Sequence, residues 1–148
     1  MYHFMQLSDM LLTAGQPTRD QLVAAARAGV QAVINLALST SEGALPDEVG
    51  LVHSLGMEYI HIPVLWEHPG RSDLECFMDV MDARQGQKLL VHCVANYRVS
   101  CFVALWRVLR HGWEAGLAFT FMRRIWDPDG YPAWKAFMAD CLGGGMDG

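Results

Sequence analysis

Apolar and polar positions alternate along the chain in blocks that predict strands and helices in turn. Four short apolar runs have the length and composition of buried strands, and turn residues bound them. These runs are Leu11–Ala14, Gln31–Leu36, Met57–Ile62 and Lys88–His92. Because no repeat or linker interrupts the alternation, we expect a single α/β domain. Its core would be a mostly parallel, twisted sheet of about four to five strands flanked by helices.

Helix signals lie between these runs. Thr18 and Gln21 have the spacing of a capping box, and the helix they open is expected to end at Gly29. Pro46 is followed by two acidic residues, which suits the first turn of a second helix ending near Gly56.

The second half of the chain is predicted to be mainly helical. Ser72 and Glu75 give another capping-box spacing, and an apolar face follows it at helical intervals. Asp127–Gly130 has the composition of a turn between the last two helices. The three final helices are expected over Val99–Arg110, Trp113–Ile125 and Pro132–Leu142.

The candidate chemistry lies where the last predicted strand ends. His92 and Cys93 follow that strand, Arg98 comes a few residues later, and Ser100 lies at the start of an apolar helical pattern. In open α/β sheets, ligands bind at the carboxyl ends of the strands. A helix N-terminus presents free N–H groups and a positive dipole, which favour bound anions and the thiolate form of a nearby cysteine. We therefore predict that Cys93 is a nucleophile for an electrophile that carries negative charge, with an inert buried thiol as the alternative.

This layout resembles the phosphate-binding loop of the cysteine-dependent protein tyrosine and dual-specificity phosphatases. Other segments resemble a small bacterial branch of that superfamily, and the similarity extends roughly from Leu7 to Phe137. It implies a phosphatase-like fold and a phosphocysteine intermediate on Cys93. The resembling segments are Gly15-Gln16-Pro17 at the first helix, the strand Val33–Leu36, and Ile62-Pro63-Val64 before the loop that carries the general acid.

The residues around the cysteine have candidate roles of their own. Arg98 would either clamp oxyanions with its planar guanidinium or hold the loop through a salt bridge. His92 would orient the loop by hydrogen bonding, with proton transfer as the alternative. Ser100 would either donate to the sulfur or cap its own helix. Tyr97 would shape the rim of the pocket. The substrate-binding loop would consist of His92, Val94, Ala95, Asn96, Tyr97 and Arg98.

The loop departs from the phosphatase signature in its length. Five residues normally separate cysteine and arginine, whereas four do so here, and Val99 stands where the arginine is expected. A shorter loop offers one N–H donor fewer to an anion. Asn96 replaces the usual glycine, and asparagine is one of the few other residues that tolerate positive φ.

A general acid is needed to protonate the leaving alkoxide. The family places an aspartate on a loop after a strand, but the corresponding segment here contains none. Glu67, beside a tryptophan, is the candidate, with an exposed loop carboxylate as the alternative. His68 is the reserve. Asp73 fits a helix start better, and Asp127 and Asp129 stay open because the last helices can fold over the pocket.

Three functions compete at this point. The first is a phosphatase-like hydrolase acting on a phosphorylated protein or small molecule, with inorganic phosphate or sulfate also fitting the loop. The second is a sulfurtransferase with a Cys93 persulfide, since a short cysteine-to-arginine spacing also resembles rhodaneses. The third is a module that binds phosphorylated partners without turnover.

Composition narrows the class of protein. The 148 residues are 52% hydrophobic, which suits one folded domain over 1–142 followed by a flexible Gly-rich tail over 143–148. No apolar run reaches the roughly 18–20 residues of a membrane span, so we expect a cytoplasmic protein. A net charge of −5 argues against nucleic-acid binding. The four cysteines lack metal-site spacing, and we expect neither a metal nor another cofactor.

Overall fold

A single five-stranded sheet organises the protein in the computed structural model, which describes residues 1–144. The strand order is β1-β2-β5-β3-β4, with every pair parallel except β1 against β2. This arrangement confirms the predicted α/β class with a mostly parallel sheet. The strands are β1 (Met5–Gln6), β2 (Leu11–Ala14), β3 (Ala32–Asn35), β4 (Glu58–His61) and β5 (Leu89–His92).

Seven α-helices accompany the sheet within residues 1–144. Short 3-10 and π-helical turns lie at Pro128–Gly130 and Asp140–Gly144. The α-helices are α1 (Arg19–Arg27), α2 (Glu48–Ser54), α3 (Arg71–Ala83), α4 (Tyr97–His111), α5 (Ala115–Ala118), α6 (Thr120–Arg123) and α7 (Pro132–Ala139).

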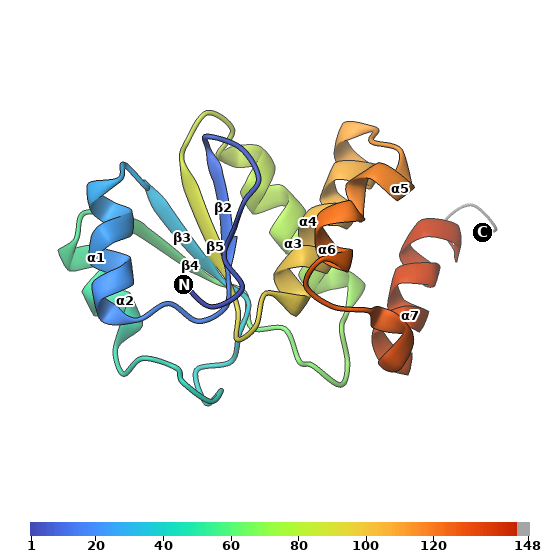
Figure 1. Ribbon diagram of the computed structural model, residues 1–148, viewed down its shortest axis with the longest axis horizontal. Helices are drawn as coiled ribbons and strands as arrows, with labels where there is room; N and C mark the ends of the chain where they lie inside the picture. The colour runs from blue at the N-terminus through green and yellow to red at the C-terminus, as the bar shows by residue number, and fades with distance from the viewer. Residues whose placement is uncertain (145–148) are drawn as a thin grey trace.

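The helices cover the sheet in layers, as Figure 1 shows, with α1 and α2 on one face and α3 and α4 on the other. The strand pleat distributes side chains between two cores, since successive residues of a strand point to opposite faces. In β5, Leu89 and Val91 join the core under α3 and α4, while Leu90 joins the core under α1 and α2. Because both faces are covered, the central strands are buried and read as continuous apolar runs.

Most predicted elements are confirmed to within one or two residues, and the capping box of α1 is confirmed in full. Thr18 Oγ1 accepts a hydrogen bond from Gln21 N at 3.2 Å, and the Gln21 side chain accepts one from Thr18 N at 2.9 Å. The second predicted capping box is wrong. Helix α3 begins at Arg71 with Gly70 as N-cap and has no side-chain cap, so Ser72 already lies inside the helix.

Two helical predictions change in detail. The segment predicted as one helix from Trp113 to Ile125 forms the two short helices α5 and α6, which meet at Phe119. Helix α4 begins at Tyr97, two residues before the predicted start at Val99. Its early start places Arg98 in the first helical turn instead of the loop, which matters for the site.

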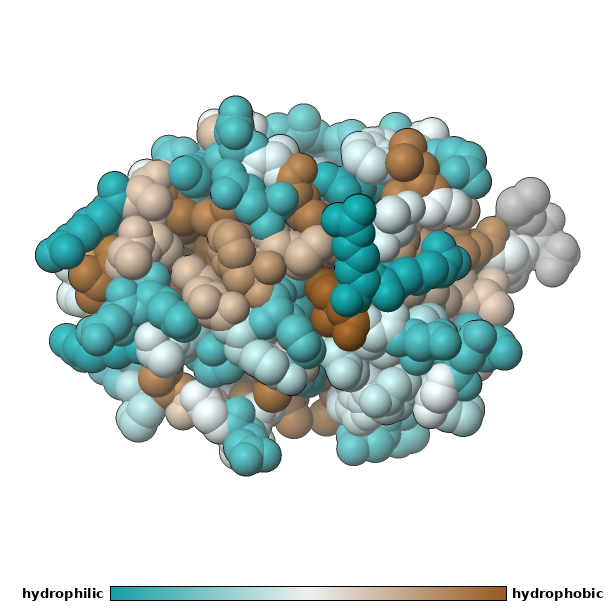
Figure 2. Space-filling view, in the orientation of Figure 1, coloured by the Kyte–Doolittle hydropathy of each residue, from teal (hydrophilic) through white to brown (hydrophobic). Residues whose placement is uncertain are grey.

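The surface is a mosaic of polar and apolar residues on the face drawn in Figure 2. Within residues 1–144, no helix is both long and apolar enough to cross a bilayer. Gly143 and Gly144 belong to the final π-helical turn. The rest of the predicted Gly-rich tail lies outside the described residues.

Candidate active site

The loop after β5 lies at the carboxyl end of the central strand. The backbone of β5 is held on both sides at this end: Cys93 N donates to Ala14 O of β2 at 3.3 Å, and Leu36 N donates to His92 O at 2.9 Å. Four residues, Cys93–Asn96, then connect β5 directly to the first turn of α4. The sheet therefore fixes the start of the loop, and the helix fixes its end.

Asn96 turns the chain from the loop into α4. It is the N-cap residue and has left-handed backbone geometry, with φ at 67°. This confirms the prediction that asparagine replaces glycine at a position of positive φ. Its side chain does not cap the helix, because Nδ2 donates to His3 O at 2.9 Å and to Thr13 Oγ1 at 3.0 Å. The helix N-terminus is left without a side-chain cap.

The carbonyl oxygens of the loop are engaged with groups outside it. Each accepts a hydrogen bond from a different part of the fold or from the first turn of α4. The pairs are Cys93 O with His92 Nδ1 (3.3 Å), Val94 O with Gln16 N (2.9 Å), Ala95 O with His3 Nδ1 (2.9 Å), Asn96 O with Ser100 N (3.0 Å) and Tyr97 O with Ser100 Oγ (3.0 Å).

The amide groups of the same segment are available for a ligand. Within residues 1–144, no protein acceptor takes a hydrogen bond from the backbone N–H groups of residues 94–99. The first N–H groups of a helix always lack an intrahelical acceptor, and the preceding loop adds further donors here. A run of consecutive N–H groups without acceptors, at the start of a helix, is the kind of donor array that binds an anion.

Cys93 and Arg98 are both almost buried beside this array. Cys93 is 1% exposed and Arg98 is 7% exposed. Arg98 Nη1 donates to Val64 O at 2.9 Å, which ties the start of α4 to the segment after β4. Its guanidinium makes no other hydrogen bond to residues 1–144, so its remaining N–H groups are available for an oxyanion.

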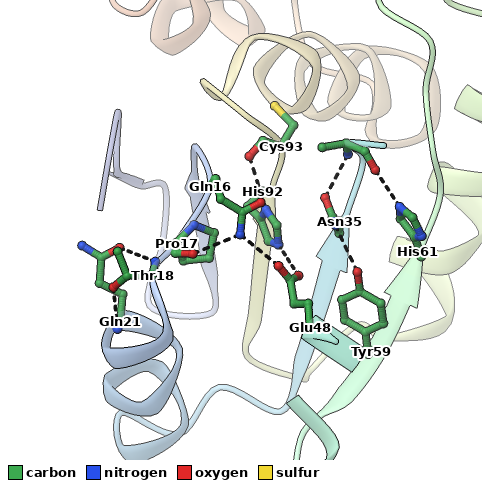
Figure 3. Close-up of polar contacts among 11 residues, drawn as sticks. Gln16, Pro17, Thr18, Gln21, Asn35, Glu48, Tyr59, His61, His92 and Cys93 are labelled. Carbon is green, nitrogen blue, oxygen red and sulfur yellow. Dashed lines mark hydrogen bonds and ion pairs between the residues drawn. The ribbon is translucent and has the colours of Figure 1, made fainter. Parts of the chain in front are cut away.

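A buried polar network supports the loop from below, as Figure 3 shows. His92 is fully buried, and its Nε2 lies 2.8 Å from Glu48 Oε2, while Gln16 Nε2 donates to Glu48 Oε1 at 2.9 Å. His92 Nδ1 contacts the Cys93 carbonyl, so both ring nitrogens face oxygen acceptors. The Cys93 sulfur points away from this network (Figure 3). These contacts are compatible with the orienting role predicted for His92, which stays a prediction.

Glu48 keeps its charge in spite of being buried. Burial acts to raise the pKa of its carboxyl group, but hydrogen bonds and charge from His92, with further hydrogen bonds from Gln16 and Tyr59, bring the pKa below its ordinary value. Tyr59 is affected in the opposite direction, since burial raises its pKa to about 12. The buried Glu48 carboxylate is therefore the charged member of the network below the loop.

Ser100 has a different partner from either one predicted. Its hydroxyl donates to Tyr97 O and accepts a hydrogen bond from Trp126 Nε1 at 2.9 Å. It therefore neither donates to the sulfur nor caps the helix in this geometry. The contact joins the loop to an aromatic cluster, in which the rings of Tyr97 and Trp126 stack 4.8 Å apart and almost parallel.

Glu67 lies on the exposed segment after β4. Its neighbour Trp66 is 6.0 Å from the Tyr97 ring, so this segment passes beside the cysteine loop. Glu67 itself borders a small cavity of about 210 Å³ that Tyr131 and Trp134 also line. Its role as general acid stays a prediction.

The alternative proton donors have other surroundings. His68 is exposed. Asp73 lies in the first turn of α3, as expected for a residue at a helix start. Asp127 caps the 3-10 turn by accepting a hydrogen bond from Asp129 N at 3.0 Å. Asp129 pairs with Lys135 at 3.6 Å.

Sequence reasoning missed two groups that support the loop. Glu48 was recognised only as part of a helix start, and nothing in its local pattern distinguishes a buried carboxylate from an exposed one. His3 lies far from the loop in sequence, and no periodic pattern surrounds it. Gln16 also supports this network, and the sequence did give a signal for it, because it belongs to the Gly-Gln-Pro segment. In residues 1–144, no group of three or more His, Cys, Asp or Glu side chains is arranged to hold a metal ion.

Comparison with solved structures places this fold among phosphatases. A crystal structure of a DUF442 protein from Shewanella putrefaciens CN-32, named as a phosphatase candidate, is 37% identical with a TM-score of 0.84. The match covers 95% of this chain and 88% of that one. TpbA of P. aeruginosa, solved with phosphotyrosine, is 18% identical with a TM-score of 0.75 over 95% and 86% of the two chains, which shows the shared fold alone.

Sequence comparison gives the same assignment. A curated relative from Xylella fastidiosa, a beta-lactamase hydrolase-like protein, is 26% identical in an alignment 135 residues long, and the match covers 80% of this chain. The chain spans only 31% of the length of that relative. Residues 5–125 match the family described as "DSP-PTPase phosphatase fused to NAD+ Kinase", and the chain therefore belongs to this family of dual-specificity-type phosphatase domains.

Proposed function

We propose that the protein is a cysteine-dependent phosphatase that removes a phosphoryl group through a phosphocysteine intermediate. One observation carries the proposal: the backbone N–H groups of residues 94–99, which follow Cys93 directly, have no acceptor within residues 1–144, while the loop carbonyls accept hydrogen bonds from other groups. Such an array binds the oxygens of a phosphoryl group and stabilises the charge that they gain in the transition state.

In the first step, the Cys93 sulfur attacks phosphorus and the ester P–O bond breaks. Arg98 and the loop amides hold the three non-bridging oxygens. The leaving oxygen takes a proton from Glu67, which we assign as the general acid because its segment passes beside Tyr97 of the loop.

In the second step, water attacks phosphocysteine, the S–P bond breaks and inorganic phosphate leaves. Glu67, now a carboxylate, accepts the proton of the attacking water. Ser100 is the candidate donor to the departing sulfur. Because its hydroxyl donates to Tyr97 O, this role requires the hydroxyl to turn from that carbonyl to the sulfur.

An aryl phosphate is the natural first probe, since TpbA has been crystallised with phosphotyrosine. We expect the purified protein to hydrolyse p-nitrophenyl phosphate between pH 5 and 8, and Cys93→Ser to remove this activity. Trapped phosphocysteine at Cys93, detected by mass spectrometry after an acid quench, would identify the intermediate. Hydrolysis that does not exceed the Cys93→Ser background would contradict the proposal.

The short loop keeps a sulfurtransferase as the second candidate, because four residues separate Cys93 and Arg98. Transfer of sulfur from thiosulfate to cyanide, dependent on Cys93, would favour it. Tight phosphate binding with neither reaction would identify a binding module that lacks turnover. The three candidates thus predict different results for the same purified protein.

A further inference from the structure

The N-terminal segment lies against the outer side of the cysteine loop, where it makes reciprocal contacts. His3 Nδ1 donates to Ala95 O at 2.9 Å, and Asn96 Nδ2 donates back to His3 O at 2.9 Å. In Figure 1 this segment, at the marked N-terminus, runs close to the loop that leaves β5. More than ninety residues of sequence separate the two sides.

Aromatic stacking extends these contacts. The Tyr2 and His3 rings stack 4.0 Å apart, His3 lies 6.2 Å from the Tyr97 ring at 14°, and Tyr97 stacks on Trp126. Four nearly parallel rings thus connect the N-terminal segment to the first turn of α4.

Both partners of the reciprocal contact have unusual backbone geometry. His3 has φ at 48° and Asn96 has φ at 67°, two of the three non-glycine residues with positive φ among residues 1–144. Such geometry persists where surrounding contacts determine it, and it concentrates at functional sites. One hydrogen bond joins the two residues directly, while Ala95 and the stacked rings also hold His3, and Thr13 also holds Asn96.

Gly15 closes the packing between the two segments. Its N–H donates to Tyr2 O at 2.7 Å, and a Cβ atom at this position would meet the Val94 carbonyl oxygen and lie 2.9 Å from Tyr2 Cδ2. Only glycine allows the N-terminal segment, the strand end of β2 and the loop to approach so closely.

We propose that His3 is a positioning residue of the anion-binding loop, and that its contact with Ala95 and Asn96 keeps the Ala95 carbonyl outward and the neighbouring N–H groups free for phosphate. The loop is one residue shorter than the phosphatase signature, so it has fewer N–H donors. If the peptide unit between Ala95 and Asn96 turned inward, its carbonyl would replace an N–H group and repel the phosphate. The role in phosphate binding rests on the proposed function, whereas the effect on loop geometry does not.

The test compares His3→Ala and His3→Asn with the matched control His53→Ala, which removes an exposed histidine on α2. Calorimetric titration measures the affinity for inorganic phosphate, and backbone NMR measures the amide resonances of residues 94–98. We expect His3→Ala to weaken phosphate binding at least tenfold and to shift these resonances. His3→Asn, whose amide can donate to Ala95 O and which tolerates positive φ, recovers most of both, and His53→Ala changes neither.

Two results would overturn the proposal: His3→Ala with unchanged phosphate affinity and loop resonances, or His3→Asn no better than His3→Ala. Gly15→Ala is the second variant, and it should weaken phosphate binding because the added methyl group forces the segments apart; unchanged affinity would also count against the coupling. A wild-type protein that neither binds inorganic phosphate nor hydrolyses an aryl phosphate would refute the proposed function. The loop resonances of the His3 variants would then still decide whether His3 positions the loop.

Discussion

The Arg98 guanidinium has one hydrogen-bond partner within residues 1–144. Nη1 donates to Val64 O, and the other N–H groups make no hydrogen bond to these residues, which leaves them available to an oxyanion. This division uses the planar, five-donor geometry of arginine, which the single ammonium group of lysine cannot reproduce.

We therefore expect Arg98→Lys to lower kcat/KM for an aryl phosphate by about 10²–10³-fold, the usual effect of losing a transition-state donor. Steady-state kinetics measures this effect, and Arg124→Lys, a change at an exposed arginine, is the control. Equal activity of both variants would show that Arg98 does not take part in the reaction.

The buried pair of Glu48 and His92 contributes to the stability of the fold. Both side chains are buried, at 6% and 0% exposure, so removal of Glu48 leaves the buried imidazole without its charged partner. We expect Glu48→Ala to lower the free energy of unfolding by about 3–5 kcal/mol, as is typical for a broken buried pair.

The control for this change is Glu58→Ala. Glu58 pairs with Arg84 at 2.7 Å, but its side chain is 49% exposed. Its loss should cost no more than about 1 kcal/mol, because water screens exposed pairs. Urea denaturation at pH 7 measures both variants, and equal costs would show that the buried pair adds no special stability.

At the scale of elements, the two predicted capping boxes show that the spacing alone does not guarantee the capping hydrogen bond. Thr18 caps α1 through a hydrogen bond with Gln21 N, whereas Ser72, with the same spacing to an acidic residue, lies inside α3. Helix α3 begins earlier than the pattern indicates, at Arg71 after Gly70.

The two positions should therefore respond differently to alanine. We expect Thr18→Ala to lower the free energy of unfolding by about 1 kcal/mol, the usual value of an N-cap. Ser72→Ala should stay within about 0.5 kcal/mol of wild type, since its side chain makes no cap contact. Urea denaturation of both variants checks this difference, and a cost of Ser72→Ala as large as that of Thr18→Ala would contradict it.

At the scale of the whole molecule, buried and paired carboxylates make stability depend on pH. The pKa of Glu48 is lower in the folded protein than its ordinary value of 4.5, in spite of burial, because of His92 and Gln16. The unfolded chain thus binds the proton more readily, so the stabilisation is present above pH 4.5 and is lost as the pH falls through the folded pKa.

We expect Glu48→Gln to be less stable at pH 7 but to lose less stability than wild type on acidification. Urea denaturation from pH 7 to pH 3 measures this slope. Some acid sensitivity will remain in the variant, because Glu58, Asp82 and Glu114 also have lowered pKa values. An acid slope as steep as that of the wild type would show that Glu48 does not contribute.

Much of the fold was predictable because its signals are local. The four main strands are apolar runs bounded by turns, and Cys93, Arg98 and Asn96 stand at fixed spacings at the end of the last one. The two-residue strand β1 was missed, since Met5–Gln6 carries no periodic pattern and forms only by pairing with β2.

The sequence by itself determined the class of fold, the position of the cysteine loop and the family resemblance, because each depends on residues close together along the chain. The tertiary structure alone decided the contacts around the loop. Glu48 binds His92 and is itself bound by Gln16, and Val64 O accepts a hydrogen bond from Arg98. Trp126 donates to the Ser100 hydroxyl, and His3 donates to Ala95 O. These contacts join segments from about 26 to 93 residues apart. Local periodicity carries no information about such distances, since the burial of both partners arises only when the layers pack.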